Sequence, residues 1–226
     1  MKLKVFYHVG DLPGWKDITD EQLGKMRDSG LLDNCELYMN LHYNESSFNQ
    51  LKAEYRDYKN IHWIFRGAAK EEYEHPTAVL MQETALATDE EFYALYIHQK
   101  GITHLGTQHE TTTKHWRWLM DYWNVERWKD CESKLDAGYE AVGCLWLPEP
   151  FPHFSGNVHW VKASFLRRCN QLKLPSQVGF VKQTEQPYHY RHDIETWYGF
   201  NGVKGYSFYN DTLNHYWNEC PPQLYR

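Results

Sequence analysis

The chain has 226 residues and a formal net charge of −6, from 24 Lys and Arg against 30 Asp and Glu. This acidic balance excludes general nucleic-acid binding, which needs a basic surface to neutralise phosphates. The five cysteines contain no Cys-x-x-Cys pair, which favours buried thiols over a disulfide framework or a thiolate zinc site. With no stretch of membrane-spanning length and no signal-peptide core, we expect a cytoplasmic protein without a transmembrane segment.

Strand-like and helix-like patterns alternate over the first hundred residues. Apolar or alternating runs predict strands at residues 3–8, 35–42, 60–65 and 92–97. The segments between them predict helices, the first capped by Thr19 and stopped at Ser29-Gly30, the second carrying Leu51 and Tyr55, and the third with Pro76 in its first turn. Such alternation is typical of an α/β fold with a mostly parallel sheet flanked by helices.

The second half has a different character. Trp116, Leu119 and Met120 fall at helical spacing and are expected to face the core, and residues 139–147 predict a fifth strand. Residues 158–166 are expected to begin extended and to pass into a helix. Nothing in the composition marks a linker, so we predict one domain over residues 1–226, with a nucleotide-sugar-binding half at 1–101 and an acceptor half and C-terminal wrap at 102–226.

In parallel α/β sheets the ligand binds beyond the carboxyl ends of the strands. The loops at these ends include His8 and the run His98-Gln-Lys-Gly101. The first strand is not followed by Gly-x-Gly-x-x-Gly, and the chain contains no Walker phosphate loop, which argues against dinucleotide oxidoreductases and P-loop enzymes.

The run from His153 to Trp160, His-Phe-Ser-Gly-Asn-Val-His-Trp, combines donors and acceptors with an indole. A sugar needs amide or imidazole partners for its hydroxyls and an aromatic ring for its apolar face, as Asn157, His153 and Trp160 could supply. The alternative is a buried turn whose polar groups satisfy one another. Single aromatic rings are more often core than ligand platform, and this applies to Trp116, Trp160 and Trp197 alike.

Five segments occur in one order with sensible spacing: Tyr96-Ile-His-Gln-Lys-Gly101; Trp116-Arg117 with Met120; Leu135 followed by Gly138-Tyr-Glu-Ala-Val-Gly143; His153-Phe-Ser-Gly-Asn157 with Trp160; and Glu195-Thr-Trp197. Over residues 74–198 the chain thereby resembles small GT-A-type glycosyltransferases of bacteria and large DNA viruses, including those that build glycans on chlorella-virus capsid proteins. The resemblance implies a GT-A-like domain and a hexosyl- or pentosyltransferase that uses a UDP- or GDP-sugar donor and a glycan or glycoprotein acceptor.

The resemblance and the strand-end loops together assign the donor side to His8, Thr77, His98, Lys100, Gly101 and His153, with Thr77 placed by family position only. GT-A enzymes commonly hold Mn²⁺ or Mg²⁺ with Asp-x-Asp after the fourth strand, but this chain has no Asp-x-Asp. One possibility is a metal held with the help of His98 and His153. The other, which we favour, is direct neutralisation of the phosphates by Lys100, with Arg117 as a candidate helper.

For the proton acceptor the resemblance favours Glu195, with Asp193 second, although acids at a helix start are often caps. The acceptor side is assigned to Trp116, Arg117, Asn157 and Trp160. Two other classes of protein stay open: a catalytically inactive nucleotide-sugar or glycan-binding protein, and a His-rich metallohydrolase suggested by 13 His residues. The second is weakened by the lack of His-Glu-x-x-His.

Overall fold

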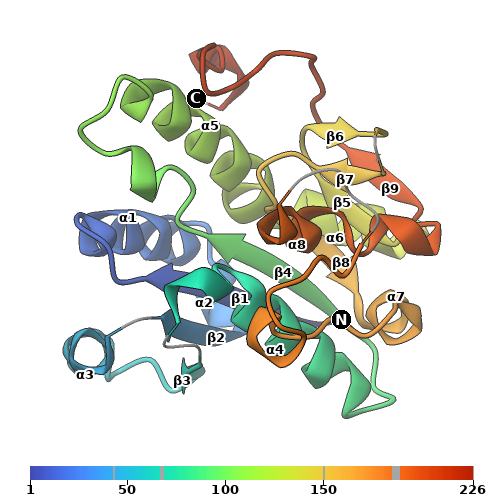
Figure 1. The fold of residues 1–226 in the computed structure, drawn as a ribbon, viewed down its shortest axis with the longest axis horizontal. Helices are drawn as coiled ribbons and strands as arrows, with labels where there is room; N and C mark the ends of the chain where they lie inside the picture. The colour runs from blue at the N-terminus through green and yellow to red at the C-terminus, as the bar shows by residue number, and fades with distance from the viewer. Residues whose placement is uncertain (43, 67–68, 150, 185–188, 226) are drawn as a thin grey trace.

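The computed structural model describes residues 1–42, 44–66, 69–149, 151–184 and 189–225 (Figure 1). One seven-stranded sheet has the order β3-β2-β1-β4-β8-β5-β9, and a separate ribbon pairs β6 with β7. The strands are β1 (Lys2–Gly10), β2 (Cys35–His42), β3 (Ile61–Phe65), β4 (Phe92–His98), β5 (Ala141–Gly143), β6 (Trp146–Leu147), β7 (His153–Phe154), β8 (His159–Lys162) and β9 (Gly205–Ser207). The helices are α1 (Trp15–Asp28), α2 (Leu31–Asn34), α3 (Glu45–Glu54), α4 (His75–Leu86), α5 (Glu110–Asp121), α6 (Trp128–Asp136), α7 (Ala163–Arg168) and α8 (Asp193–Thr196).

Strands β3, β2, β1 and β4 are all parallel, and β9 is parallel to β5. Strand β8 is antiparallel to both of its neighbours, β4 and β5. The predicted fold class, an α/β fold with a mostly parallel sheet flanked by helices, is therefore confirmed. The four strands expected in the first hundred residues are β1, β2, β3 and β4, and the expected passage from strand to helix after residue 158 is β8 followed by α7.

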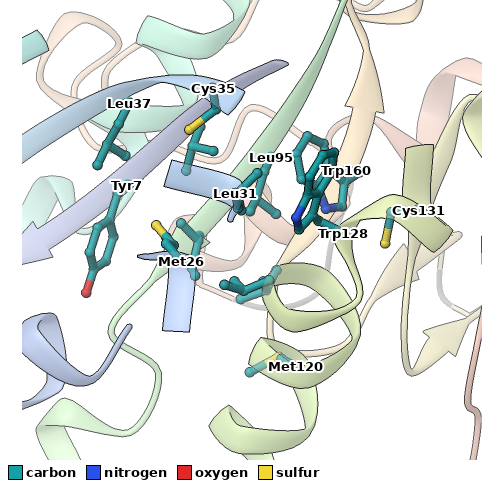
Figure 2. Close-up of a cluster of buried hydrophobic side chains, with 14 of the residues drawn as sticks. Tyr7, Met26, Leu31, Cys35, Leu37, Leu95, Met120, Trp128, Cys131 and Trp160 are labelled. Carbon is teal, nitrogen blue, oxygen red and sulfur yellow. The ribbon is translucent and has the colours of Figure 1, made fainter. Parts of the chain in front are cut away.

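Alternate side chains of the central strands enter two different hydrophobic clusters, as the period of two in a strand requires. Tyr7 on β1 and Leu95 on β4 belong to the first cluster, which also holds buried side chains of α1, α2, α5 and α6 (Figure 2). Phe6 and Tyr96 belong to the second cluster, with side chains of α4, α7 and α8. Trp116, Leu119 and Met120 lie in the first cluster, as predicted from their helical spacing.

Two local predictions were wrong. Helix α1 begins at Trp15 after Gly14, whose φ of 81° is a left-handed conformation that glycine favours, so Thr19 lies one turn inside the helix and not at its cap. Its hydroxyl donates to the carbonyl of Trp15. The segment 139–147 is not one strand, because Leu145 at φ 62° turns the chain between β5 and β6. Among the helices in the described ranges, none is both long and apolar enough to cross a bilayer.

Candidate functional site

A pocket opens where β1 and β4 end, at the carboxyl edge of the parallel part of the sheet. Its wall includes His8 from β1 and the run from His98 to Gly101 that ends β4. The other sides come from Glu74 before α4 and from Glu195 on α8. The side chains of β1 and β4 reach the same pocket because His8 pairs with His98 in register across the two parallel strands. This is the edge of the sheet at which α/β proteins bind ligands.

An imidazole and a carboxylate face each other in this pocket. Nδ1 of His98 lies 3.4 Å from Oε1 of Glu74, and Nε2 of His98 lies 2.8 Å from the carbonyl oxygen of Gly156. Burial alone would raise the pKa of the Glu74 carboxyl, but the contact with His98 and the nearby charge of Arg191 outweigh it and hold that pKa below its usual range. Glu74 is therefore an ionised carboxylate, and His98 is fixed in orientation on both ring nitrogens.

His8 is held by a chain of side chains from two other elements. Its Nδ1 lies 2.9 Å from Oγ1 of Thr77, and the same hydroxyl accepts a hydrogen bond of 2.9 Å from Nδ2 of Asn40. Asn40 is itself fixed, because its Oδ1 accepts from the backbone N–H of Arg66. Burial lowers the pKa of His8 to about 3, although the charge of Glu74 acts in the opposite direction. His8 is consequently neutral at pH 7. Thr77 does not line the pocket itself but orients the imidazole of His8, which does.

Two cationic side chains line the pocket. Nζ of Lys100 lies 3.9 Å from the centroid of the Trp116 ring, and Cζ of Arg191 lies 5.1 Å from that of Tyr73. Neither cation forms an ion pair with a carboxylate in the described part of the chain. Burial lowers the pKa of His104, another pocket residue, and the neighbouring His109, Lys100 and Arg191 lower it further. Lys100 and Arg191 line the same pocket, so an anion bound there would be attracted by both.

Asn157 is the residue through which the run 153–160 reaches the pocket. Its side chain is 2% exposed, and its Oδ1 has no hydrogen-bond partner among the described residues. Its φ of 54° is a left-handed conformation that asparagine tolerates better than most residues. A buried amide oxygen without a partner costs free energy unless a ligand or water supplies a donor. Asn157 thus offers an acceptor for a ligand hydroxyl.

Glu195 and Asp193 occupy different environments although both begin α8. Glu195 lines the pocket, and its carboxylate makes no hydrogen bond or ion pair within the described ranges. Asp193 is fully buried and accepts hydrogen bonds from the backbone N–H of Gln183 and the hydroxyl of Thr184. Asp193 therefore holds the segment before α8 in place, whereas Glu195 is available to a ligand.

Several predicted residues lie behind the pocket or away from it. Trp160 is 1% exposed in the first cluster, where its Nε1–H donates to the carbonyl of Asn124 (Figure 2). Arg117 is buried and donates to the carbonyl of Lys100, with Glu21 as its ion-pair partner. His153 lies on β7, and its Nδ1 bonds the carbonyl of Phe151. The buried indole of Trp116 lies under Lys100.

Gly101 lines the pocket directly, at a φ of 88°. A Cβ atom there would lie 2.9 Å from Oγ1 of Thr113, so only glycine fits without displacement. Arg191 and Tyr216 also line the pocket, although no sequence pattern predicts a role for either. Arg191 lies between Tyr190 and His192, and no periodic pattern there distinguishes it from a surface arginine. Glu74 could have been suspected as an acid placed just before Pro76 in a helix start.

The residues suggested for a metal do not form a ligand set. Both ring nitrogens of His98 already face Gly156 and Glu74, and His153 bonds Phe151 outside the pocket lining. Within the residues that the structure describes, no group of three or more His, Cys, Asp or Glu side chains is arranged to hold a metal ion. The His-rich metallohydrolase alternative gains no support from this arrangement.

A family profile matches residues 8–208 of the chain, a range that includes most of the pocket. The chain belongs to DUF8361, a family described as a domain of unknown function. No curated protein matches this DUF8361 member. Among solved structures, it is similar to the crystal structure of 4-diphosphocytidyl-2C-methyl-D-erythritol synthase from Anaerococcus prevotii DSM 20548. That likeness has a TM-score of 0.47 and 8% sequence identity, and it covers 93% of this chain and 89% of the other.

Proposed function

We propose that this DUF8361 protein is a glycosyltransferase that moves a sugar from a nucleoside-diphosphate sugar, such as a UDP- or GDP-sugar, to a glycan, glycoprotein or other hydroxylated acceptor. One observation carries the proposal. The pocket at the strand ends brings together two cations and one carboxylate that have no ionic partner among the described residues, namely Lys100, Arg191 and Glu195.

The chemistry of the transfer fits these groups. The acceptor oxygen bonds to the anomeric carbon, the bond from that carbon to the phosphate oxygen breaks, and its electron pair leaves with the diphosphate. Lys100 and Arg191 would stabilise the charge that develops on the leaving diphosphate. Glu195 would accept the proton of the attacking hydroxyl in an inverting reaction. Asn157 would accept a hydrogen bond from a sugar hydroxyl through its free Oδ1.

The proposed roles of Arg117 and Thr77 differ from the interpretation based on sequence. Arg191 takes the position beside Lys100 that was considered for Arg117, because Arg117 is engaged by Glu21. Thr77 is proposed to orient His8 and not to touch the donor. Direct neutralisation by side chains stays the preferred alternative to Mn²⁺ or Mg²⁺, as in the interpretation based on sequence.

A thermal-shift panel tests the proposal. UDP-, GDP-, CMP- and dTDP-sugars are each added to the full chain with Mn²⁺ or with EDTA, because a ligand bound only by the native state raises the melting temperature. We expect at least one donor to stabilise the protein in both conditions and to be hydrolysed or transferred. The proposal fails if no nucleotide sugar shifts the melting temperature. Tight binding without turnover of any donor would instead favour the inactive binding protein.

A further inference from the structure

The aromatic residues first considered as sugar platforms are covered by other side chains. Trp116 and Trp160 lie in the first hydrophobic cluster, and Trp197 lies in the second. An aromatic platform for a sugar needs an accessible ring face, which none of these three indoles presents. The surface beside the pocket provides a different indole.

Trp217 is 64% exposed, more than any other large hydrophobic side chain in the described residues. It follows Tyr216, which lines the pocket. The centroid of the His109 ring lies 4.3 Å from that of Trp217, with the ring planes at 82°. His104, which also lines the pocket, packs its ring 5.2 Å from Tyr216 and 5.7 Å from His109. A continuous row of rings therefore leads from the pocket to the exposed indole.

The backbone under this row is firmly held against the start of α5 (Figure 1). The carbonyl of Tyr216 accepts hydrogen bonds of 2.8 Å from Nδ1 of His109 and from the hydroxyl of Thr112. Asn214 closes a turn on the other side, since its Oδ1 accepts from the N–H of Tyr216 and its carbonyl accepts from the N–H of Trp217. An exposed indole on a braced backbone loses little conformational freedom when it binds a ligand.

The surroundings of Trp217 in the chain are mostly polar. Asn214, Asn218 and Glu219 are exposed, and so is the apolar Leu213. Oδ1 of Asn214 accepts from the N–H of Tyr216, Nδ2 of Asn218 donates to the carbonyl of Asn214, and Glu219 lies beside His115, which in the described part of the chain leaves Nδ2 of Asn214 and Oδ1 of Asn218 for a ligand. A protein-binding surface usually has an apolar centre, with charged residues depleted there. One flat ring bordered by hydrogen-bonding groups matches a pyranose instead, which has an apolar face and hydroxyls around its rim.

We infer that Trp217, braced by His109, is the stacking platform for a sugar ring of an oligosaccharide acceptor whose reacting end enters the pocket past Tyr216. That the reacting end of the acceptor enters the pocket rests on the proposed function. Stacking of a sugar ring on Trp217 does not require that the protein catalyses transfer. The row of rings then orients the acceptor towards Glu195, which lines the same pocket as Tyr216.

Fluorine NMR of the full chain labelled with 5-fluorotryptophan tests the site. The chain has 10 Trp residues, and the Trp217 resonance is assigned by its loss in Trp217→Phe. The probes are hexasaccharides of glucose, mannose, galactose, xylose and N-acetylglucosamine, each titrated with and without UDP. We expect at least one probe to shift the Trp217 resonance saturably, and Trp217→Ala to raise its dissociation constant at least about tenfold. His109→Ala keeps the indole but removes its brace, so it should weaken the same probe by a smaller factor.

Phe65→Ala is the matched control, because Phe65 is an exposed ring at the end of β3, outside the pocket lining. It should leave the affinity for the probe unchanged. The inference is overturned if no hexasaccharide moves the Trp217 resonance, or if Trp217→Ala binds the probe as tightly as the unmodified chain. A Trp217 resonance that moves only with protein concentration would also overturn it, in favour of self-association. Sugar binding at Trp217 without any nucleotide binding would contradict the proposed function and leave this site standing.

Discussion

The ammonium of Lys100 lies 3.9 Å from the centroid of the Trp116 ring, and this contact places in the pocket a cation that has no carboxylate partner among the described residues. A cation over an indole face is stabilised by about 0.5–2 kcal/mol without losing its positive charge. The carbonyl of Lys100 is fixed at the same time by Nη1 of Arg117. Trp116 and Arg117 therefore position Lys100 from behind, which explains why two residues expected to bind an acceptor are buried.

Replacing Lys100 with Met should reduce the affinity for inorganic pyrophosphate and for UDP at least about tenfold, because a charge-assisted contact is lost. Isothermal titration calorimetry measures the change. Lys114→Met is the matched control, since Lys114 also lies over an indole, 4.7 Å from the Trp118 ring, but lines no part of the pocket. Equal affinities of Lys100→Met and the unmodified chain would remove Lys100 from the phosphate site.

Glu195→Gln should abolish transfer while donor affinity stays within about twofold, because the amide keeps the size of the side chain but cannot accept the proton. Transfer is followed by release of the nucleoside diphosphate, and donor binding by calorimetry. Retained turnover in this variant would exclude Glu195 as the base.

Asp193→Ala should lower the free energy of unfolding by about 1–3 kcal/mol, because the N–H of Gln183 and the hydroxyl of Thr184 lose their acceptor. Urea unfolding measures the loss. Glu195→Ala provides the comparison two residues away, and it should change stability by less than about 0.5 kcal/mol. If the two variants are equally stable, Asp193 does not hold its segment.

Gly156→Ala should destabilise the fold and weaken ligand binding together. A Cβ atom would lie 2.7 Å from Sδ of Met120, and displacement of Gly156 would move the carbonyl that orients His98. Gly179→Ala separates strain from packing, because Gly179 also has a positive φ, of 73°, but nothing lies near the added methyl group. We expect Gly156→Ala to cost about 1–3 kcal/mol more than Gly179→Ala in urea unfolding. Equal losses would show that backbone strain alone is responsible.

His159 should make the fold sensitive to acid. Burial lowers its pKa from 6.5 to about 3, so between these values the unfolded chain binds a proton that the native chain does not. Above pH 6.5 neither state binds this proton, and the free energy of unfolding is unaffected by it. As the pH falls from 6.5 towards 3, protonation of the unfolded chain lowers the free energy of unfolding. From pH 7.5 to pH 5 the loss from His159 should be about 2 kcal/mol, at about 1.4 kcal/mol per pH unit below 6.5.

His159→Phe provides the test of this pH dependence. The imidazole lies among the rings of Phe154, Tyr198 and Tyr96, and its Nδ1 is buried without a hydrogen-bond partner among the described residues. A phenyl ring should therefore raise stability at pH 7.5 by about 1 kcal/mol and flatten the decline to pH 5. An unchanged slope in urea unfolding between these pH values would contradict the assignment.

The parallel half of the fold was predictable because its signals are local. A strand buried on both faces is a short apolar run, and β1 and β4 are runs of this kind. The cap at Thr19 was wrong because Gly14 starts α1 one turn earlier through a left-handed backbone conformation. A Thr-x-x-Gln capping pattern therefore does not fix the start of a helix when a glycine lies one turn before it.

Only the part of the pocket that is formed by the ends of β1 and β4 was predictable from the sequence. His8, His98, Lys100 and Gly101 follow β1 and β4, and the topology of a parallel sheet brings such residues together. The side chains of Trp160 and Arg117 are buried and do not line the pocket. Sheet pairing and helix rotation decide their direction, and neither is encoded in the spacing of single residues. Trp217 and Arg191 lie in segments without periodicity, so only the folded chain places them beside the pocket.

Strand β8 has a consequence for the order in which the chain can fold. It fills the place between β4 and β5 in antiparallel direction, so β4 keeps an unpaired edge during synthesis until residue 162 has been made. An open edge of that kind can pair with another chain. The pocket walls that carry Arg191 and Tyr216 emerge later still. The complete pocket therefore forms only after β8 can cover the edge of β4, so ligand binding at the complete pocket cannot protect that edge during synthesis.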